Sequence, residues 1–254
     1  MRLRLRQICL VARDLEPVVA DLKRVFGLEV CYVDDAVAAY GLVNALLPVG
    51  HQFLEVVAPT RPGTAAGRYL DRRGGDGGYM VITQCPDLEA KRRRVAELGV
   101  RIANPLEHCD FQGMQLHPRD TGGAFFEIDC QQGGEAEDGP WHPAGPDWKP
   151  HVRTDIVSAI VAAELQSPDP DRLATRWSQI AEIPLEGDGR GALVMPFDNA
   201  ALRFVEAVNG RGEGLAGLDL KGGDADAAFA NARAAGLPVE DGIIALGGMR
   251  FRLV

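Results

Sequence analysis

Several features that would place the chain in a specialised class are missing from its sequence. No apolar run approaches the roughly 20 residues that a membrane-spanning helix needs. The N-terminus alternates arginine with leucine and runs straight into Ile8-Cys9-Leu10-Val11, without the apolar region and cleavage site of a signal peptide. The five cysteines are an odd number without C-x-x-C spacing, which favours reduced thiols that serve packing. These absences favour a soluble cytoplasmic protein with no membrane partner.

Positive charge is scarce as well. Lys and Arg total 27 against 36 Asp and Glu, so the formal net charge is −9 at pH 7. Nucleic acids and anionic membrane surfaces repel such a chain, so neither is expected as its main partner. The glycine run at 74–78 is not followed by Lys-Ser or Lys-Thr, so it is not a phosphate-binding loop of that kind.

A repeated pattern fills the chain instead. An aspartate opens a predicted helix at four places: Asp14, Asp87, Asp169 and Asp224. A strand-like run precedes each aspartate, and further strand-like runs follow each helix. In the first copy the expected strands are 5–12, 28–33, 38–47 and 53–57, followed by a polar connection over 59–78. The pattern predicts an α+β fold of four βαβββ modules with curled mixed sheets.

The composition changes between Gln131 and Pro150, where Gly, Pro, Glu and Trp replace the periodic pattern. Such a stretch is typical of a linker. The sequence therefore predicts a paired-module domain over residues 1–132, a linker over 133–154, and a degenerate second domain over 155–254.

One carboxylate stands out in the second module. Glu127 lies on the apolar strand Phe125-Phe126-Glu127-Ile128, which follows the turn from His117 to Gly123. Because an isolated buried charge is costly, this carboxylate is expected either near water at the sheet end or held by a partner such as a metal ion.

Anchoring the modules on their helix-opening aspartates makes the remaining positions comparable. Seven residues before these aspartates stand Gln7, Met80, Ala162 and Gly217. The last strands of the modules align Glu55 with Glu206 and Glu127 with Arg252. The C-terminal set of Ala162, Glu206, Gly217 and Arg252 is therefore not expected to hold a cation.

This organisation resembles the vicinal oxygen chelate superfamily, which includes glyoxalases, extradiol dioxygenases, methylmalonyl-CoA epimerases and antibiotic-resistance proteins. The segments 47–60, 69–74 and 116–123 look most like the methylmalonyl-CoA epimerase branch. The resemblance covers about residues 5–130, whereas residues 155–254 match only the repeat pattern. It implies two vicinal-oxygen-chelate domains, each with a curled sheet around a cleft.

In that superfamily the first and last strands of paired modules typically hold a divalent metal, which implies Gln7, Glu55 and Glu127 as metal ligands here. Oxygen donors of this kind suit Mg, Mn, Co, Zn or Fe, which the sequence does not distinguish. Met80 departs from the pattern, because a thioether is a poor ligand for a hard ion. The site is then open, incomplete, or filled by Tyr79 or by water. Either Glu127 or Glu55 would double as the catalytic base.

Some further residues have two interpretations each. Tyr79 and His117 are expected either to bind the substrate or to serve strand packing and a surface hydrogen bond. The cations at 91–94, with Arg61, Arg68, Arg72 and Arg73, would either contact the phosphates of a CoA-like ligand or form a solvated face. The solvated face is favoured.

The resemblance implies a glyoxalase-like enzyme that acts on a small carbonyl or acyl substrate, with acyl-CoA among the candidates. The reaction would be metal-assisted proton abstraction of the epimerase, isomerase or lyase type. The alternative is a metal-free protein of the same fold that binds or sequesters a small molecule. An extradiol dioxygenase fits the four modules but would place iron at Gly217 and Arg252. The C-terminal half is expected to be a scaffold or a dimerisation half of a homodimer, with Arg252 facing Glu206 either in a structural ion pair or as a guanidinium available to an anionic ligand.

Overall fold

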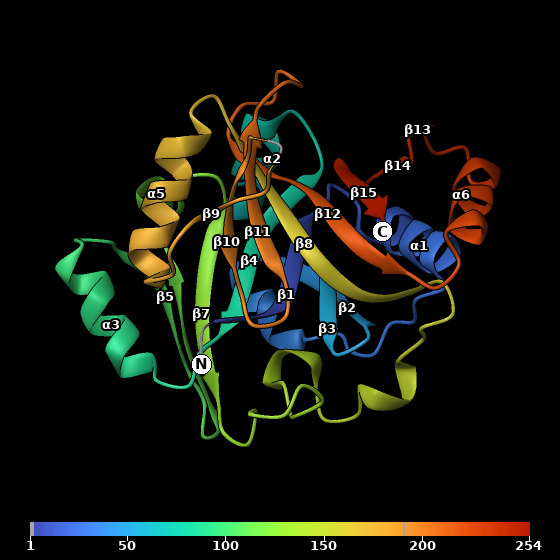
Figure 1. Cartoon of the computed structure of the whole chain (residues 1–254). Coiled ribbons are helices and arrows are strands. Elements are labelled where there is room, and N and C mark those ends of the chain that lie inside the picture. The colour runs from blue at the N-terminus through green and yellow to red at the C-terminus, as the bar shows by residue number, and fades with distance from the viewer. Residues whose placement is uncertain (1–2, 190) are drawn as a thin grey trace. The chain divides into compact units, whose positions relative to one another are not determined.

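The computed structural model describes residues 3–189 and 191–254 and contains two mixed β-sheets (Figure 1). The first sheet has seven strands in the order β2-β3-β1-β4-β7-β6-β5. Strands β4 and β7 run parallel, whereas β5, β6 and β7 form an antiparallel ladder. The strands are β1 (Arg4–Val11), β2 (Leu42–Val49), β3 (Gln52–Pro59), β4 (Gly77–Gln84), β5 (Ile102–Glu107), β6 (Phe111–Leu116) and β7 (Phe125–Gln131).

The second sheet has eight strands in the order β13-β14-β15-β12-β8-β11-β10-β9. It also mixes parallel pairs, such as β8 with β11 and β12 with β15, with antiparallel ones. The strands are β8 (Val157–Ser167), β9 (Glu186–Gly187), β10 (Leu193–Pro196), β11 (Ala201–Glu206), β12 (Gly214–Gly222), β13 (Val239–Glu240), β14 (Ile243–Leu246) and β15 (Met249–Leu253).

One helix follows the first strand of each module, as the repeat predicts: α1 (Leu15–Phe26), α3 (Leu88–Glu97), α5 (Pro170–Ala181) and α6 (Ala225–Ala234). The predicted aspartates are their N-caps. Asp87, Asp169 and Asp224 each accept a hydrogen bond from a backbone N–H of the first turn, whereas Asp14 occupies the position without such a bond. The predicted α+β class with four modules and two mixed sheets is therefore confirmed.

The first module departs from the prediction in two places. Residues 28–33 were expected to form a strand, but only Tyr32 pairs with the sheet, in an isolated bridge to Leu46. Pairing stops there because Asp34 caps the 3-10 helix η1 (Asp35–Tyr40), which also takes the start of the strand predicted over 38–47. The predicted polar connection contains a helix, α2 (Ala65–Arg73), whose N-cap is Thr64.

The chain divides into two compact units that each combine segments from distant parts of the sequence. Unit 1 consists of Met1–Gln7, Tyr79–His142 and Ala162–Leu215, and unit 2 of Ile8–Gly78, Pro143–Val161 and Ala216–Val254. Helices α3 and α5 lie beside one another in unit 1, as α1 and α6 do in unit 2 (Figure 1). The domain boundary predicted at 133–154 stays a prediction, because it concerns whether residues 1–132 and 155–254 can each fold alone.

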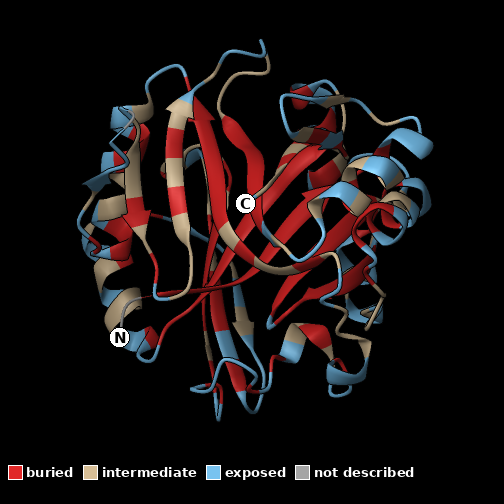
Figure 2. Cartoon of the chain, turned by 45° about the vertical axis from the view of Figure 1, so that its right-hand side comes forward, coloured by how far each residue is buried: buried red, intermediate tan, exposed pale blue. Residues whose placement is uncertain are grey.

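Apolar side chains of the strands and of one face of each long helix form the cores, while the outer helix faces are exposed (Figure 2). In unit 1 the rings of Phe126 and Trp177 stack with their centroids 4.4 Å apart. In unit 2, Phe26 packs against Phe251 at 5.2 Å. Among the described residues, no helix is long and apolar enough to cross a membrane.

The segment 133–154, predicted as a linker, is anchored by two buried tryptophans, although most of its residues are exposed or half-buried. Trp141 is only 1% exposed and Trp148 only 2%. Two short 3-10 helices, η2 (His142–Ala144) and η3 (Lys149–His151), follow these tryptophans. Two buried arginines of β1 hold the first part of the segment: Arg4 donates to the carbonyls of Gly134 and Glu135, and Arg6 to that of Glu137. The start of the segment is thus fixed by hydrogen bonds in unit 1.

Candidate active site

Glu127 lies inside the sheet of unit 1, on a strand with neighbours on both sides. In β7 it stands opposite Ile82 of β4 and Gln115 of β6, and it is only 3% exposed. Of the two expected environments, the structure therefore excludes the one near water at a sheet end. A carboxyl group at this depth needs a partner that offsets the loss of hydration.

A second carboxyl group, that of Asp129, lies two residues further along the same strand face. It is fully buried, and no N–H group among the described residues donates to its side-chain oxygens. Burial, followed by the charge of Glu127 and a hydrogen bond with the Glu127 carboxyl group, raises the pKa of Asp129 well above its usual range. The two groups therefore form a carboxyl pair, which holds one proton more readily than two separate carboxyl groups do.

Gly113 makes room for this pair. It stands opposite Asp129 in the ladder between β6 and β7, and a Cβ atom at this position would overlap Oδ1 of Asp129. Asp129 was not among the residues predicted from the sequence. The signal was present, because residues two apart on a strand point to the same face, so Glu127 and Asp129 had to be considered together.

Gln7, the first predicted metal ligand, is 2% exposed at the end of the β1 segment that belongs to unit 1. Its Oε1 accepts a hydrogen bond of 2.9 Å from Nε1 of Trp141. An indole N–H is only a donor, so the atom of Gln7 that faces Trp141 must be the oxygen. Trp141 also packs edge-on against Phe111 and lies 5.0 Å from the Arg6 guanidinium. One lone pair of the predicted ligand atom is therefore engaged within the protein.

Glu55, the second predicted carboxylate, belongs to unit 2 and is 8% exposed on β3. Its Oε1 accepts a 2.7 Å hydrogen bond from Nδ2 of Asn44 on the neighbouring strand β2. The other end of the Asn44 amide accepts from the backbone N–H of Asp34. Asn44 thus orients the Glu55 carboxylate.

The remaining predicted site residues have structural contacts. Met80 and Tyr79 are buried on β4, and the Tyr79 ring packs edge-on against Phe125 at 5.0 Å. His117 is the N-cap of the short helix α4 (Pro118–Thr121), where its Nδ1 accepts from the backbone N–H of Arg119. These contacts match the packing and hydrogen-bonding interpretations of the two residues, and a role in substrate binding stays a prediction for both.

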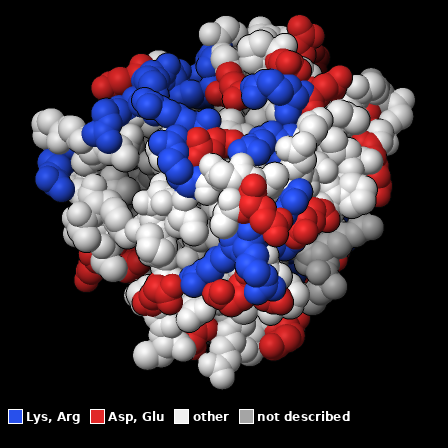
Figure 3. Space-filling model, turned by 90° about the vertical axis from the view of Figure 1, so that its left-hand side faces the viewer, with Lys and Arg blue, Asp and Glu red and all other residues white. Residues whose placement is uncertain are grey.

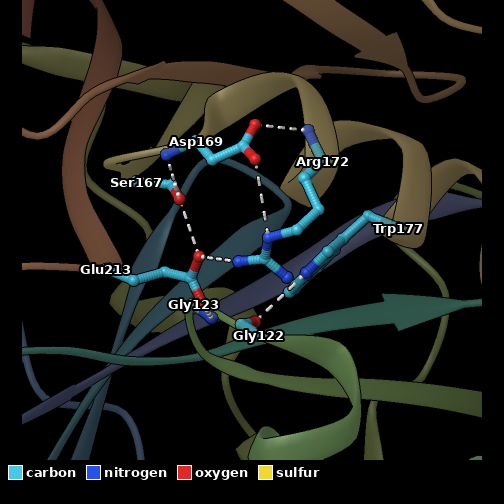
Figure 4. Close-up of polar contacts among 7 residues, drawn as sticks. All are labelled: Gly122, Gly123, Ser167, Asp169, Arg172, Trp177 and Glu213. Atoms are coloured by element: carbon cyan, nitrogen blue, oxygen red, sulfur yellow. Dashed lines mark hydrogen bonds and ion pairs between the residues drawn. The ribbon is translucent and has the colours of Figure 1, made fainter.

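The turn before β7 is held by a carboxylate that the sequence did not reveal. Glu213 accepts hydrogen bonds from the backbone N–H of Gly123 at 3.1 Å and from the Ser167 hydroxyl at 2.7 Å (Figure 4). Arg172 of α5 forms an ion pair with the same carboxylate at 2.7 Å. Gly123 lies far from Ser167 and Arg172 in the sequence, and Glu213 lies further along still, so sequence spacing could not have identified the cluster.

A cleft of about 750 Å³ opens beside this turn, between α4 and α5. The indole N–H of Trp177 donates to the carbonyl of Gly122 at its edge, and Arg176 donates to the carbonyl of Asp120. Side chains of both charges line the cleft, including Arg119, Arg172 and Asp171. The 118–123 turn belongs to the 116–123 segment that resembles the epimerase branch. It is held by Glu213 and by the hydrogen bonds from Arg176 and Trp177 of α5.

The C-terminal counterparts of the predicted ligands have other roles. Arg252 pairs with Asp219, its partner in the register between β12 and β15, at 3.0 Å. The expected structural ion pair therefore involves Asp219 in unit 2, whereas Glu206 is an exposed residue of unit 1. Sequence alignment could not foresee this pairing because Asp219 lies on the adjacent strand.

Cys31 and Cys85 fit a packing role, whereas Cys109 is exposed. Burial is the main reason that the pKa values of Cys31 and Cys85 rise to about 12. Thiols with such pKa values stay protonated at neutral pH and are poor nucleophiles.

Comparison with known proteins identifies the family. A model of the glyoxalase-like domain matches residues 8–181, which is more than half of the chain, so the chain belongs to this family. One sequence relative is the ethylmalonyl-CoA/methylmalonyl-CoA epimerase of Cereibacter sphaeroides. It is 24% identical over 130 residues, covering 50% of this chain and 96% of the relative. The likeness of the N-terminal half to the methylmalonyl-CoA epimerase branch is therefore confirmed.

Two solved structures extend the likeness over nearly the whole chain. A hypothetical protein from Staphylococcus aureus matches with a TM-score of 0.66 at 14% identity, over 99% of both chains. A mutant of 4-hydroxymandelate synthase from Streptomyces coelicolor matches with a TM-score of 0.68 at 14% identity, over 92% of this chain and 75% of that one. At this identity the two structures show a shared fold.

Proposed function

We propose that this chain is an enzyme that removes a proton from the carbon next to the carbonyl group of a small carbonyl or acyl substrate, with Glu127 as the base. The observation that supports this most directly is the buried carboxyl pair of Glu127 and Asp129. Two carboxyl groups held together inside a sheet destabilise the fold, and such arrangements gather at functional sites. Membership of the glyoxalase-like family and the epimerase relative support the reaction class.

Glu127 is preferred over Glu55 as the base for a structural reason. Glu55 already accepts a hydrogen bond of 2.7 Å from Asn44, so one of its carboxylate oxygens is engaged within the protein. Glu127 instead lies beside the buried Asp129, whose pKa is raised by burial and by the charge of Glu127, so the pair can hold a proton between its two carboxyl groups. Proton return to the other face of the substrate carbon would complete an epimerisation, whereas loss of a neighbouring group would make the reaction a lyase.

The predicted ligands Gln7, Glu55 and Glu127 carry oxygen donors, which suit a divalent metal ion. The carboxyl oxygens of Asp129 are buried beside Glu127 and receive no hydrogen bond from an N–H group of the described residues, and a cation would offset the charge of the pair when it ionises. The Gln7 oxygen has a second lone pair beyond the one that Trp141 uses. The residues predicted to hold the ion are Gln7, Glu55 and Glu127. When bound, the ion would polarise the substrate carbonyl as a Lewis acid.

Deuterium exchange tests the proposal. The full chain is incubated in D2O with a panel of acyl-CoA thioesters and small ketones, and incorporation at the carbon next to the carbonyl is followed by mass spectrometry. Exchange of at least one substrate is expected. It should fall by about 10²-fold or more in Glu127→Gln and persist in Glu186→Gln, an exposed control on β9. Undiminished exchange in Glu127→Gln would overturn the assignment of the base.

Metal analysis of the same samples separates the two parts of the proposal. If metal is bound at the predicted ligands, Glu127→Gln should lower the metal content, and chelation should slow the exchange. Exchange that is insensitive to chelation but lost in Glu127→Gln would reject the metal and leave the base in place.

The hydrogen bond from Trp141 to Gln7 favours a second candidate, a metal-free protein that binds a small molecule. This function predicts that a ligand raises the melting temperature to the same extent with and without chelator. Stabilisation that disappears on chelation would reject it.

A further inference from the structure

Two buried arginines of β1 hold one segment of the chain in place. Arg4 is 5% exposed and Arg6 only 1%. Burying a guanidinium group is costly unless its N–H groups find acceptors. Backbone carbonyl groups are the acceptors here, because Arg4 donates to Gly134 and Arg6 donates to Glu137 at 2.6 Å. The segment 134–141 is therefore fixed against β1 by the arginines of that strand.

The cations on the surface of unit 1 have a different kind of partner. On the face that carries α3 and α5, basic and acidic side chains are interspersed (Figure 3). Arg92 of α3, for example, pairs with Glu89 at 3.1 Å and with Glu107 at 2.7 Å. Such surface pairs contribute little to stability. The buried arginines of β1 instead depend on a backbone segment that has to lie in one place.

The segment 134–141 ends in Trp141, whose ring is fixed on two sides. The Arg6 guanidinium lies 5.0 Å from the ring centroid, and Phe111 packs edge-on at 5.5 Å. A buried indole N–H needs an acceptor, and Oε1 of Gln7 provides it at 2.9 Å. Strand β1 thus fixes the segment through its arginines, and the segment returns a hydrogen bond to the next residue of the same strand.

This hydrogen bond determines how the Gln7 amide is turned. An amide carries an oxygen and an NH₂ group, and rotation of the last side-chain bond exchanges their positions. Only the oxygen can accept from the Trp141 indole, and only the oxygen suits a divalent cation. The exchanged amide would place two donor groups against each other inside the protein, so it is disfavoured. One lone pair of the oxygen serves the indole, and the other suits a cation.

We propose that Trp141 is a positioning residue of the metal site, which holds the Gln7 amide with its oxygen presented to a divalent cation. Trp141 acts through Gln7 and is not itself a ligand, because an indole N–H is only a donor. Partners that orient a metal ligand commonly change metal affinity by about 10–100-fold. Both residues belong to unit 1. This inference rests on the proposed function, because it takes Gln7 as a metal ligand.

Metal titration of the full chain tests this role. Protein freed of metal by a chelator is titrated with Mn²⁺ and with Zn²⁺ in a calorimeter. Trp141→Phe keeps a ring at the position but lacks the N–H, and should bind both ions about tenfold more weakly or worse. Trp148→Phe is the matched control, because Trp148 is also buried, at 2% exposure, and packs edge-on against Phe53. It should bind as the wild type does.

A double-mutant cycle separates positioning from a general loss of structure. Gln7→Ala should weaken binding by itself, and adding Trp141→Phe should weaken it no further, because the residue through which Trp141 acts is gone. A merely structural role of Trp141 would lower the affinity again. Circular dichroism and melting temperature in chelator establish that each variant is folded.

The wild-type chain offers a second readout that needs no variant to fold. In NMR spectra, Zn²⁺ should shift the indole N–H resonance of Trp141 more than those of Trp148 and Trp177, because only Trp141 shares its acceptor with the ion. A Trp141 resonance that moves no more than the other two would contradict the role.

Several titration results would overturn the inference: equal affinity of Trp141→Phe and the wild type, equal losses in Trp141→Phe and Trp148→Phe, full additivity with Gln7→Ala, or wild-type affinity of Gln7→Ala. If the wild-type chain binds neither ion, the inference falls together with the metal part of the proposed function. Deuterium exchange then still tests Glu127 as the base. If the ions bind and Trp141→Phe is unaffected, the positioning role alone is wrong.

Discussion

Among single residues, Asp129 shows how burial sets the protonation of a side chain. Its carboxyl group is fully buried and lies beside Glu127. The neutral form is therefore favoured, and the pKa of Asp129 is raised. An acid with a raised pKa contributes stability below its unfolded value, about pH 4, and loses that contribution as the pH rises through the folded value. The pair therefore destabilises the protein progressively towards alkaline pH.

Replacing this carboxyl group by an amide should remove that pH dependence. Asp129→Asn has no proton to lose, and its amide can donate to Glu127. Its melting temperature, measured in chelator, should exceed that of the wild type by a margin that grows between about pH 5 and pH 8. Because a tenfold change in proton affinity corresponds to about 1.4 kcal/mol, a shift of several degrees is expected. Asp155→Asn, at an exposed position, is the control. A margin that is constant or shrinks with pH would contradict the raised pKa.

The sequence predicted some site residues well and others not at all. Glu127 was identifiable because it interrupts an apolar strand, and the structure does bury it. Trp141, the hydrogen-bond partner of Gln7, could not be identified from the sequence, because it lies in a segment whose composition indicates a linker. The composition of a segment reflects only its own residues. The two arginines that hold the segment 133–154 lie on β1, far away in the sequence. The Glu213 cluster was unpredictable for the same reason.

At the scale of single elements, the fit between β6 and β7 depends on Gly113. A methyl group at this position would overlap the Asp129 carboxyl group. Gly113→Ala should therefore destabilise the chain by about 1–3 kcal/mol, as overpacking of a core does. Gly187→Ala is the matched control, since Gly187 lies on β9 and a methyl group there would meet no atom within 4 Å. Chemical denaturation measures both, and equal stability of the two variants would refute the close fit.

The turn that precedes β7 depends on Glu213. Removing its carboxylate in Glu213→Ala leaves the Gly123 N–H, the Ser167 hydroxyl and the Arg172 guanidinium without this acceptor. A loss of about 1–3 kcal/mol is expected, together with faster hydrogen exchange of the Gly123 amide. Glu186→Ala serves as the exposed control. Unchanged exchange at Gly123 would show that the turn is held by other contacts, such as the Trp177 hydrogen bond to Gly122.

At the scale of the whole molecule, the compact units combine segments from both halves of the sequence. The fragment 1–132 lacks residues 162–215 of unit 1 and residues 143–161 and 216–254 of unit 2. It would expose Phe126, whose ring otherwise stacks on Trp177. We therefore expect this fragment to aggregate or to unfold without cooperativity, whereas the full chain unfolds cooperatively. Cooperative unfolding of the isolated fragment would support the domain boundary predicted from composition.

The order of elements was predictable because each module carries its own signals. An aspartate begins each long helix, and an apolar run precedes it. The prediction was wrong at residues 28–33, where β-like residues have too few pairing partners before the turn at Asp34. Which segments join into one compact unit was not predictable, because local periodicity contains no information on contacts across the chain.

The central claim is that Glu127 removes the substrate proton, and isotope exchange by carboxyl variants tests it most directly. The rate of deuterium incorporation next to the carbonyl of a substrate that the wild type exchanges is compared for the wild type, Glu127→Gln and Glu55→Gln at saturating substrate. If Glu127 is the base, Glu127→Gln should lose about 10²-fold or more of the rate while remaining folded by circular dichroism, and Glu55→Gln should lose less. Exchange that survives in Glu127→Gln but is lost in Glu55→Gln would contradict the claim.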